Sequence, residues 1–150
     1  MNLVIDASVL IKFYVPEILS DKAVQLFHNL EEGNISLLAP DLIYPEMGNI
    51  LWKKQQRGEL IRSEVEEITD AILSLPLTIE TSKPLVKLAV DISMGFGITV
   101  YDALYVSLAM VQETKMLTAD KKLVTAMAKT DLRKYVMWLG GWGEVKSYQR

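Results

Sequence analysis

Four carboxylates in this chain occupy positions from which a fold could bring them together. They are Asp6, Glu46, Asp102 and Asp120. Carboxylate oxygens are hard ligands that suit Mg²⁺ or Mn²⁺, and several like charges are tolerated close together only around a cation. If the fold gathers these side chains at one place, the chemistry that they predict is metal-assisted.

Two of these acids follow apolar segments that are typical of buried parallel strands. The run Leu3-Val4-Ile5 stops at Asp6, and residues 115–118 lead to Asp120 in the same way. Parallel strands end at one edge of a sheet, where the sites of open α/β proteins lie, so adjacent strands would make the two acids neighbours. Taken by itself, Asp120 is better explained as the cap of the helix that is predicted to begin at Lys121.

Asp102 is the one charged residue in the fifteen-residue stretch 97–111. With Thr99 it forms the S/T-x-x-D pattern of a capping box, which explains an acid at a helix N-terminus without any catalytic role. The apolar surroundings favour a different interpretation, because a helix that is apolar on every side is buried and a buried carboxylate must be paired or bind a metal. No basic residue lies near Asp102 in the sequence.

Glu46 lies beside the apolar face of a helix predicted over about residues 42–57. An acid in the first turn of a helix complements the helix dipole, and this accounts for Glu46 taken by itself. The alternative is that Glu46 joins the other carboxylates. Asn49, one turn further on, would then either orient Glu46 or be another exposed amide.

Other chemistries lack the residues that they require. The chain has no cysteine and one histidine, His28, which argues against thiolate metal sites, a zinc hydrolase and a Ser-His-Asp triad. The Walker pattern that binds nucleotide phosphates and the GxGxxG pattern that binds dinucleotides are both absent from the sequence. A phosphatase that used Asp6 as its nucleophile would want a second carboxylate two residues later, and that position is Ser8.

The composition is that of an ordinary globular protein. With 150 residues, 50% of them hydrophobic and 23% charged, the chain is expected to form one domain with a single core. The absence of cysteine fits a reducing cytosol, and no signal-peptide pattern or membrane-length apolar run is present, so we expect a cytoplasmic protein with no membrane partner. A net charge of −3 argues against a basic coat over the whole surface, so contacts with nucleic acid would be local.

The elements that must position the acids alternate between strands and helices. Strands are predicted at 3–5, 35–39, 77–80, 115–118 and 136–139, and helices at 8–14, 20–32, 42–57, 62–75, 82–96, 99–113 and 121–129. This alternation predicts a mainly parallel α/β sheet with helices on both faces, joined by right-handed crossovers. From Gly140 onward the sequence has no clear pattern.

The four acids and the segments around them resemble a known family. The ordered set resembles the acidic quartet of PIN-domain ribonucleases, and the surrounding strings are similar to the VapC toxins of VapBC toxin–antitoxin pairs. These strings are VIDASVLIKFYVPE, PDLIYPEMGNILWK, GITVYDALYVSLA and MLTADKKL. The resemblance covers about residues 1–138, which we expect to form the PIN domain, and leaves 139–150 as a C-terminal tail without an assigned role.

The resemblance implies a fold, a reaction and partners. The fold is a three-layer α/β/α PIN-like fold with a central, mainly parallel sheet. The reaction is hydrolysis of RNA phosphodiester bonds with Mg²⁺ or Mn²⁺, and Asp6, Glu46, Asp102 and Asp120 match the acids that hold the ion. The implied assembly is a homodimer that is neutralised by a cognate VapB-like antitoxin, whose C-terminal segment enters the site. Pro45, directly before Glu46, departs from the family pattern and leaves the start of that helix open.

Further residues near the quartet have expected supporting roles. Ser8 matches the small hydroxyl residue that accompanies the first acid of the family. The other supporting residues are Asn49, Thr99 and Thr118. Basic residues that are close to the acids in sequence are expected to contact the phosphate backbone of the RNA substrate. They are Lys12, Lys53 and Lys121.

Apolar residues near the site offer a place for the antitoxin. An amphipathic helix of the partner is expected to dock on a surface that includes Leu10, Phe13, Tyr14, Ile50 and Trp52. The alternative for each of these residues is a place in the protein core.

Two other functions stay open on the sequence alone. One is a nonenzymatic PIN-like module that binds RNA or protein, in which the acids only cap helices; an intact quartet argues against it. The other is a metal-dependent DNA nuclease or phosphatase that uses the same acidic site, since recognition of the RNA 2′-hydroxyl leaves no sequence motif.

Overall fold

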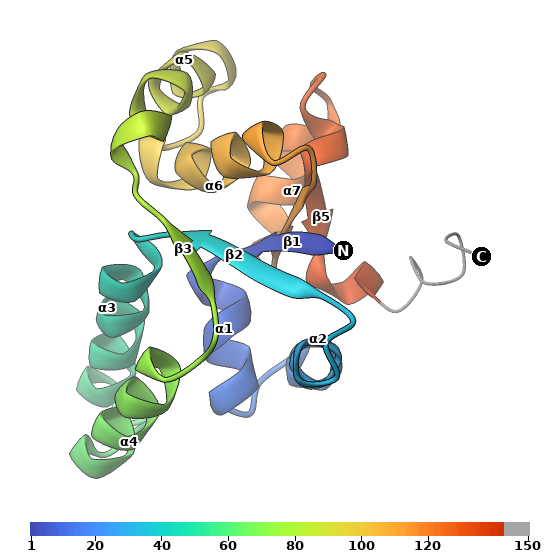
Figure 1. The fold of residues 1–150 in the computed structure, drawn as a ribbon. Coiled ribbons are helices and arrows are strands. Elements are labelled where there is room, and N and C mark those ends of the chain that lie inside the picture. The colour runs from blue at the N-terminus through green and yellow to red at the C-terminus, as the bar shows by residue number, and fades with distance from the viewer. Residues whose placement is uncertain (143–150) are drawn as a thin grey trace.

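The computed structural model describes residues 1–142, in which one parallel sheet carries helices on both faces (Figure 1). The strands are β1 (Asn2–Ile5), β2 (Ser36–Pro40), β3 (Thr78–Glu80), β4 (Lys115–Thr118) and β5 (Val136–Trp138). Their order in the sheet is β3-β2-β1-β4-β5, and each neighbouring pair is parallel. The predicted α/β/α architecture is therefore confirmed.

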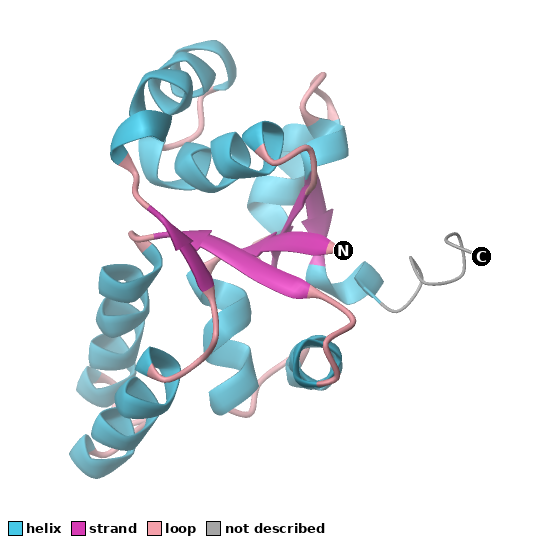
Figure 2. Cartoon of the chain, viewed as in Figure 1, coloured by secondary structure: helices cyan, strands magenta, loops and turns pink. Residues whose placement is uncertain are grey.

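The helices form the two outer layers. On one side of the sheet lie α1 (Ala7–Tyr14), α2 (Ser20–Glu31), α3 (Ile43–Gln56) and α4 (Arg62–Leu73). On the other side lie α5 (Val86–Phe96), α6 (Val100–Val111) and α7 (Lys121–Ala128). Figure 2 shows the strands between these two groups of helices. Because β1 has β2 on one side and β4 on the other, the direction of winding changes at β1, and the crevice of such a sheet lies at the carboxyl ends of β1 and β4.

The central strand β1 is buried on both faces. Leu3, Val4 and Ile5 are at most 2% exposed. A continuous apolar run is what a strand with helices above and below requires, which is why β1 is apolar from Leu3 to Ile5. On one face α6 packs across β1, β2 and β4, and its residues 103–109 are all buried. The packing of α6 on β1 thus holds the backbone in place at the carboxyl ends of the strands.

Two proline residues explain how the helices α5 and α3 begin. The helix predicted over 82–96 begins instead with a 3₁₀ turn at Lys83–Leu85, which contains Pro84, and continues as α5. Pro45 lies in the first turn of α3, where its missing N–H would have no helical partner in any case. The helix that carries Glu46 therefore begins before the proline, at Ile43.

The chain after β5 is part of the packed body as far as residue 142, in contrast to the tail expected from residue 139. Leu139 and Trp142 are 0% and 1% exposed, and Leu139–Gly141 form a 3₁₀ turn. Gly140 lies so close to Trp138 that an added Cβ would be 2.5 Å from the indole ring. A single tryptophan after two glycines has no periodicity, so the sequence pattern did not reveal this packing. Residues 143–150 lie outside the described part of the chain.

None of the described helices is by itself long and apolar enough to cross a membrane. The segments Lys83–Phe96 and Val100–Val111 reach the required length and composition only as a pair, and the chain bends by 115° between them.

Candidate active site

Asp6 stands directly after the central strand and is buried, with 8% of its surface exposed. Its Oδ1 caps α1 by accepting a hydrogen bond from the Val9 N–H at 3.2 Å, and it also accepts one from the Ser8 hydroxyl. Its Oδ2 accepts a hydrogen bond from the Thr118 hydroxyl. Burial raises the pKa of Asp6 to about 6; the three hydrogen bonds oppose this shift, and the charge of Asp102 adds to it. Asp6 is thus a rigidly oriented carboxylate that is costly to ionise.

Two hydroxyl groups connect Asp6 to the end of β4. Ser8 Oγ accepts a hydrogen bond from the Ala119 N–H at 3.0 Å, and Thr118 Oγ1 accepts one from the Asp120 N–H at 3.0 Å. Each hydroxyl therefore donates to Asp6 and accepts from the backbone that follows β4. The structure places both of these expected supporting residues against the first acid.

Glu46, in the first turn of α3, faces Tyr105 of α6. Glu46 Oε1 and the Tyr105 hydroxyl oxygen are buried, and neither makes a hydrogen bond of good geometry within the described residues. Burial raises the pKa of Glu46; the nearby Tyr105 hydroxyl opposes this shift, and the charges of Asp6 and Asp102 add to it. Burial and the Glu46 carboxylate raise the pKa of Tyr105, so the phenol keeps its proton. The two side chains are therefore close enough to interact, although their geometry falls short of a well-formed hydrogen bond.

Asp102 lies in the first turn of α6 and is partly buried. The Thr99 hydroxyl oxygen accepts a hydrogen bond from the Asp102 N–H at 3.1 Å, so the predicted cap is present. Burial raises the pKa of Asp102; the charge of Asp120 raises it further, and the Thr99 hydroxyl lowers it. The cap uses the Asp102 N–H, and the Asp102 carboxylate interacts with the Thr99 hydroxyl and with the other acids.

Asp120 is exposed and caps α7, as the alternative interpretation of this residue predicts. Its Oδ1 accepts hydrogen bonds from the Lys122 N–H at 3.0 Å and the Leu123 N–H at 3.3 Å. Both bonds go to the same oxygen, so the described hydrogen bonds leave Oδ2 available. The cap therefore does not exclude Asp120 from a site shared with Asp102.

The four acids form a series of like charges, not a closed cluster. Repulsion acts between Asp6 and Asp102, between Glu46 and each of these two, and between Asp102 and Asp120. Within residues 1–142, no three acidic, histidine or cysteine side chains are gathered closely enough to form a ready-made metal site. The structure brings the acids within electrostatic range of one another without placing them around a common point.

The donor set fits a hard divalent cation. No ion pair in the described part of the chain involves any of the four acids, so their mutual repulsion is not balanced by a basic side chain. Glu46 Oε1 is a buried carboxylate oxygen without a hydrogen bond there. Oxygen ligands of this kind and charge are those that Mg²⁺ and Mn²⁺ prefer.

The lysines that are expected to contact RNA differ in how accessible they are. Lys12 forms an ion pair with Glu17 at 3.5 Å, and its side chain is 16% exposed. Lys53 is exposed on α3. Lys121 is exposed at the start of α7, where its Nζ lies 4.6 Å from the centre of the Trp138 ring. A carboxylate therefore already engages Lys12, whereas Lys53 and Lys121 reach solvent.

The apolar residues that are expected to bind a partner helix differ in how far they are buried. Leu10 is 0% exposed, so its proposed place in a docking surface is wrong. Phe13, Tyr14 and Ile50 are partly buried against the core. Trp52, at 55% exposed, is the member of this set that clearly reaches solvent.

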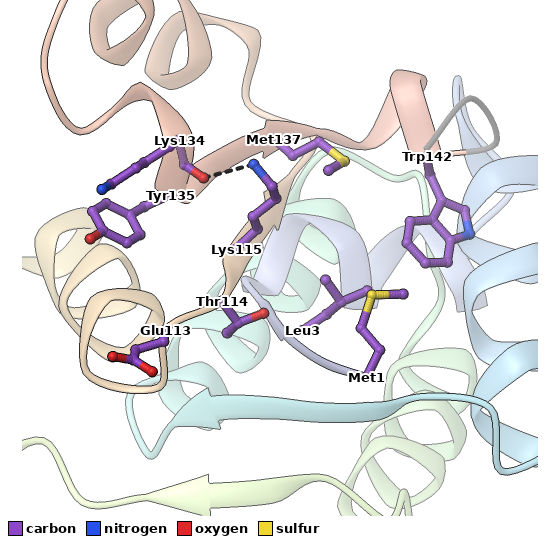
Figure 3. A pocket seen from close by; sticks show the side chains of 9 residues that line it. All are labelled: Met1, Leu3, Glu113, Thr114, Lys115, Lys134, Tyr135, Met137 and Trp142. Carbon is purple, nitrogen blue, oxygen red and sulfur yellow. Dashed lines mark hydrogen bonds between the residues drawn. The ribbon is translucent and has the colours of Figure 1, made fainter. Parts of the chain in front are cut away.

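A pocket of about 610 Å³ lies away from the four acids (Figure 3). It is lined by Met1, Leu3, Glu113, Thr114, Lys115, Lys134, Tyr135, Met137 and Trp142. Several of these residues lie near the amino ends of β1 and β4, opposite the edge at which Asp6 and Asp120 stand. The Lys115 ammonium donates to the Lys134 carbonyl oxygen at 2.8 Å, the dashed line in Figure 3. This pocket therefore does not belong to the candidate acidic site.

Tyr105 is the site residue that the sequence analysis missed. Of the two roles left open for Asn49, the structure supports the exposed amide, because Asn49 is exposed on α3 and Tyr105 faces Glu46 instead. The available signal is spacing, because Tyr105 follows Asp102 by three residues and so shares its face of α6.

Comparison with known protein families matches residues 3–129 to the PIN domain. Ribonuclease VapC3 of Pyrobaculum aerophilum is 34% identical over 125 residues, which are 82% of this chain and 92% of that protein.

Solved structures show the same fold. PAE2754 from Pyrobaculum aerophilum superposes with a TM-score of 0.70 at 21% identity, covering 100% of this chain and 91% of that one. A chain of VapBC2 from Rickettsia felis, solved bound to a DNA fragment from their promoter, superposes with a TM-score of 0.64 at 14% identity, covering 92% of this chain and 98% of that one.

Proposed function

Because this chain belongs to the PIN-domain family, we propose that it is a metal-dependent endoribonuclease that acts in the cytoplasm as the toxin of a toxin–antitoxin pair. The name of its relative Ribonuclease VapC3 supports the reaction. The observation that carries the proposal concerns Asp6. Hydrogen bonds fix the orientation of its carboxylate at the end of the central strand, and the charge of Asp102 acts on it there.

The proposed cofactor is Mg²⁺ or Mn²⁺. Asp6 and Asp102 would hold the ion, and Glu46 and Asp120 would complete the set of ligands or hold the attacking water. When bound, an ion of this kind lowers the pKa of a bound water and offsets the charge that develops on the phosphate.

The hydrogen bonds around Asp6 determine what this residue contributes. Ser8 and Thr118 each donate to one carboxylate oxygen, and the Val9 N–H donates to Oδ1. Three donors favour the ionised form of a buried carboxylate and limit its rotation. Asp6 therefore presents its charge in a fixed direction, so little reorientation is needed when the substrate and the ion bind.

RNA is the proposed substrate, and its phosphates are proposed to contact Lys121, Lys122 and Lys53. Lys121 and Lys122 occupy the first turn of α7, where a positive charge opposes the helix dipole and does not stabilise the helix. A role in phosphate binding accounts for two exposed lysines at this position beside Asp120. With so few basic residues, the affinity for RNA should depend only weakly on salt concentration.

The proposed partners are a VapB-like antitoxin and a second copy of this chain. A structural neighbour of this chain is a VapBC pair, which supports the first of these. Trp52 on α3 is an exposed aromatic residue of the kind that anchors protein interfaces.

The test of this function is cleavage of end-labelled single-stranded RNA and of DNA with the same base sequence. We expect internal cleavage of RNA with Mg²⁺ or Mn²⁺, none with EDTA, and none by Asp6→Asn protein. Preferential cleavage of DNA would select the DNA nuclease instead, and binding of RNA without cleavage would select the nonenzymatic module. If the product of a neighbouring gene neither binds the protein nor blocks cleavage, the toxin role is wrong even where nuclease activity stands.

A further inference from the structure

Tyr105 brings a hydroxyl group to the acidic site. The side chain is 1% exposed and comes from the buried face of α6, one turn after Asp102. Packing explains the ring but not the hydroxyl, because phenylalanine would fill the same space without burying an O–H group. The hydroxyl therefore requires a partner.

Within residues 1–142, one partner of suitable chemistry is indicated for this hydroxyl. Three buried side-chain atoms lack a hydrogen bond in the described part of the chain: the Tyr105 hydroxyl oxygen, Glu46 Oε1 and Ser93 Oγ. The first two are neighbours, because the Tyr105 side chain of α6 and the Glu46 side chain of α3 lie within reach of a hydrogen bond. Buried polar atoms in folded proteins nearly always have partners, and here a donor and an acceptor that lack any other lie beside each other.

We propose that Tyr105 is a positioning residue whose hydroxyl donates to Glu46 Oε1 and orients the Glu46 carboxylate toward the other acids. The inference rests on the proposed function, because it assumes that Glu46 is one of the groups around the cation. With Oε1 held by the phenol, the other oxygen is directed to the site, and groups that orient ligands in this way strengthen metal binding. Burial and the Glu46 carboxylate raise the pKa of Tyr105, so the phenol keeps its proton and can donate it in a hydrogen bond.

The test removes one oxygen atom by Tyr105→Phe, with Ser107→Ala as the matched control. Ser107 is also buried on α6, but its hydroxyl donates to the Ala103 carbonyl oxygen at 2.7 Å within the helix. In metal-free protein, carbon NMR of the glutamate side chains follows the Glu46 carboxyl, whose signal is identified by its loss in Glu46→Gln. We expect the titration midpoint of Glu46 to rise in Tyr105→Phe and to stay unchanged in Ser107→Ala.

Calorimetric titration with Mn²⁺ measures the consequence for the cation. Tyr105→Phe should weaken Mn²⁺ binding roughly tenfold, and Ser107→Ala should leave it unchanged. In a Glu46→Gln background, Tyr105→Phe should cause no further loss. An unchanged Glu46 midpoint would overturn the proposal, and so would a loss of Mn²⁺ affinity that persists in the Glu46→Gln background.

Two further outcomes separate this inference from the proposed function. If the wild-type protein binds no Mn²⁺ but the Glu46 midpoint rises in Tyr105→Phe, the metal site fails and the pairing of Tyr105 with Glu46 stands. The reciprocal variant gives a readout that does not need Tyr105→Phe to fold. In Glu46→Gln the Cζ resonance of Tyr105 should move, and an unmoved resonance would contradict the pairing.

Discussion

Two groups of partly buried charges in this molecule are built in opposite ways. At the site, Asp6, Glu46 and Asp102 are like charges whose pKa values are raised by burial and, to a smaller extent, by neighbouring acids. Near the far ends of α1 and α3, charges of both signs form ion pairs, and we refer to these residues as the mixed-charge cluster. They are Lys12, Glu17, Lys54 and Glu59.

The mixed-charge cluster is balanced by the chain itself. Lys54 Nζ lies 3.1 Å from Glu17 and 3.3 Å from Glu59, and its side chain is 13% exposed. Burial lowers the pKa of Lys54, but the hydrogen bonds and charges of the two glutamates outweigh burial and raise it. A cluster of this kind stabilises the fold, whereas the acids of the site stay unbalanced until a positive group arrives from outside.

The largest expected effect comes from neutralising one of the unbalanced acids by Asp102→Asn. RNA cleavage should fall at least about 100-fold, while the free energy of unfolding should stay the same or increase, because a repelling charge is removed. Cleavage assays and chemical denaturation on the same protein measure the two effects.

A purely structural Asp102 gives the opposite result. If its carboxylate acts only at the helix start, Asp102→Asn should leave cleavage unchanged and cost about 0.5–2 kcal/mol of stability. Thr99→Ala, which removes the cap oxygen itself, shows the size of such a loss.

The next largest effect is a dependence of stability on pH that originates at the site. The pKa of Asp6 rises from its usual 3.8 to about 6 on folding, so between these values the folded protein binds a proton that the unfolded chain does not. The contribution of Asp6 to stability is therefore present at low pH and is lost as pH rises through 6, a loss of roughly 2–3 kcal/mol by pH 7. Denaturation in EDTA should show the protein more stable at pH 5 than at pH 7.

Two comparisons assign this pH dependence to the site. Asp6→Asn should reduce the difference between pH 5 and pH 7, and millimolar Mn²⁺ should stabilise the wild-type protein more at pH 7 than at pH 5. If stability depends on pH equally in the wild type and in Asp6→Asn, a group other than Asp6 causes the pH dependence.

The smallest effect is expected in the mixed-charge cluster. Lys54→Met keeps the apolar stem of the side chain and removes its hydrogen bonds to Glu17 and Glu59, which should cost roughly 1–2 kcal/mol of stability. RNA cleavage should be unchanged. Lys53→Met, at the exposed neighbouring position, is the control and should change stability by less than about 0.5 kcal/mol. A loss of cleavage in Lys54→Met would mean that this lysine serves the site after all.

The strands and the order of the acids were predictable because they depend on local patterns. An apolar run that ends at a carboxylate identified both Asp6 and Asp120, and the rule for parallel sheets predicted their common edge. The partners of individual side chains were not predictable in this way. Lys54 pairs with Glu17, and Glu46 faces Tyr105, through contacts between separate elements that no periodicity records.

The packing after β5 was missed for a related reason. Burial of Trp142 depends on the space left between elements that are distant in the sequence, and a lone aromatic residue gives no repeat from which to infer it. Sequence patterns thus predicted which backbone elements form and where they end, but not which side chains meet across them.

The hydrogen bond from Thr118 to Asp6 joins residues that are 112 positions apart in the chain. β1 leaves the ribosome before the other strands of the sheet, and its neighbour β4 follows only after β2 and β3. At roughly 5–20 residues per second, β1 is without this neighbour for several seconds or longer. A nascent chain that ends before Thr118 lacks both this hydrogen bond and Asp120. The acidic site therefore cannot form until β4 and Asp120 have been synthesised.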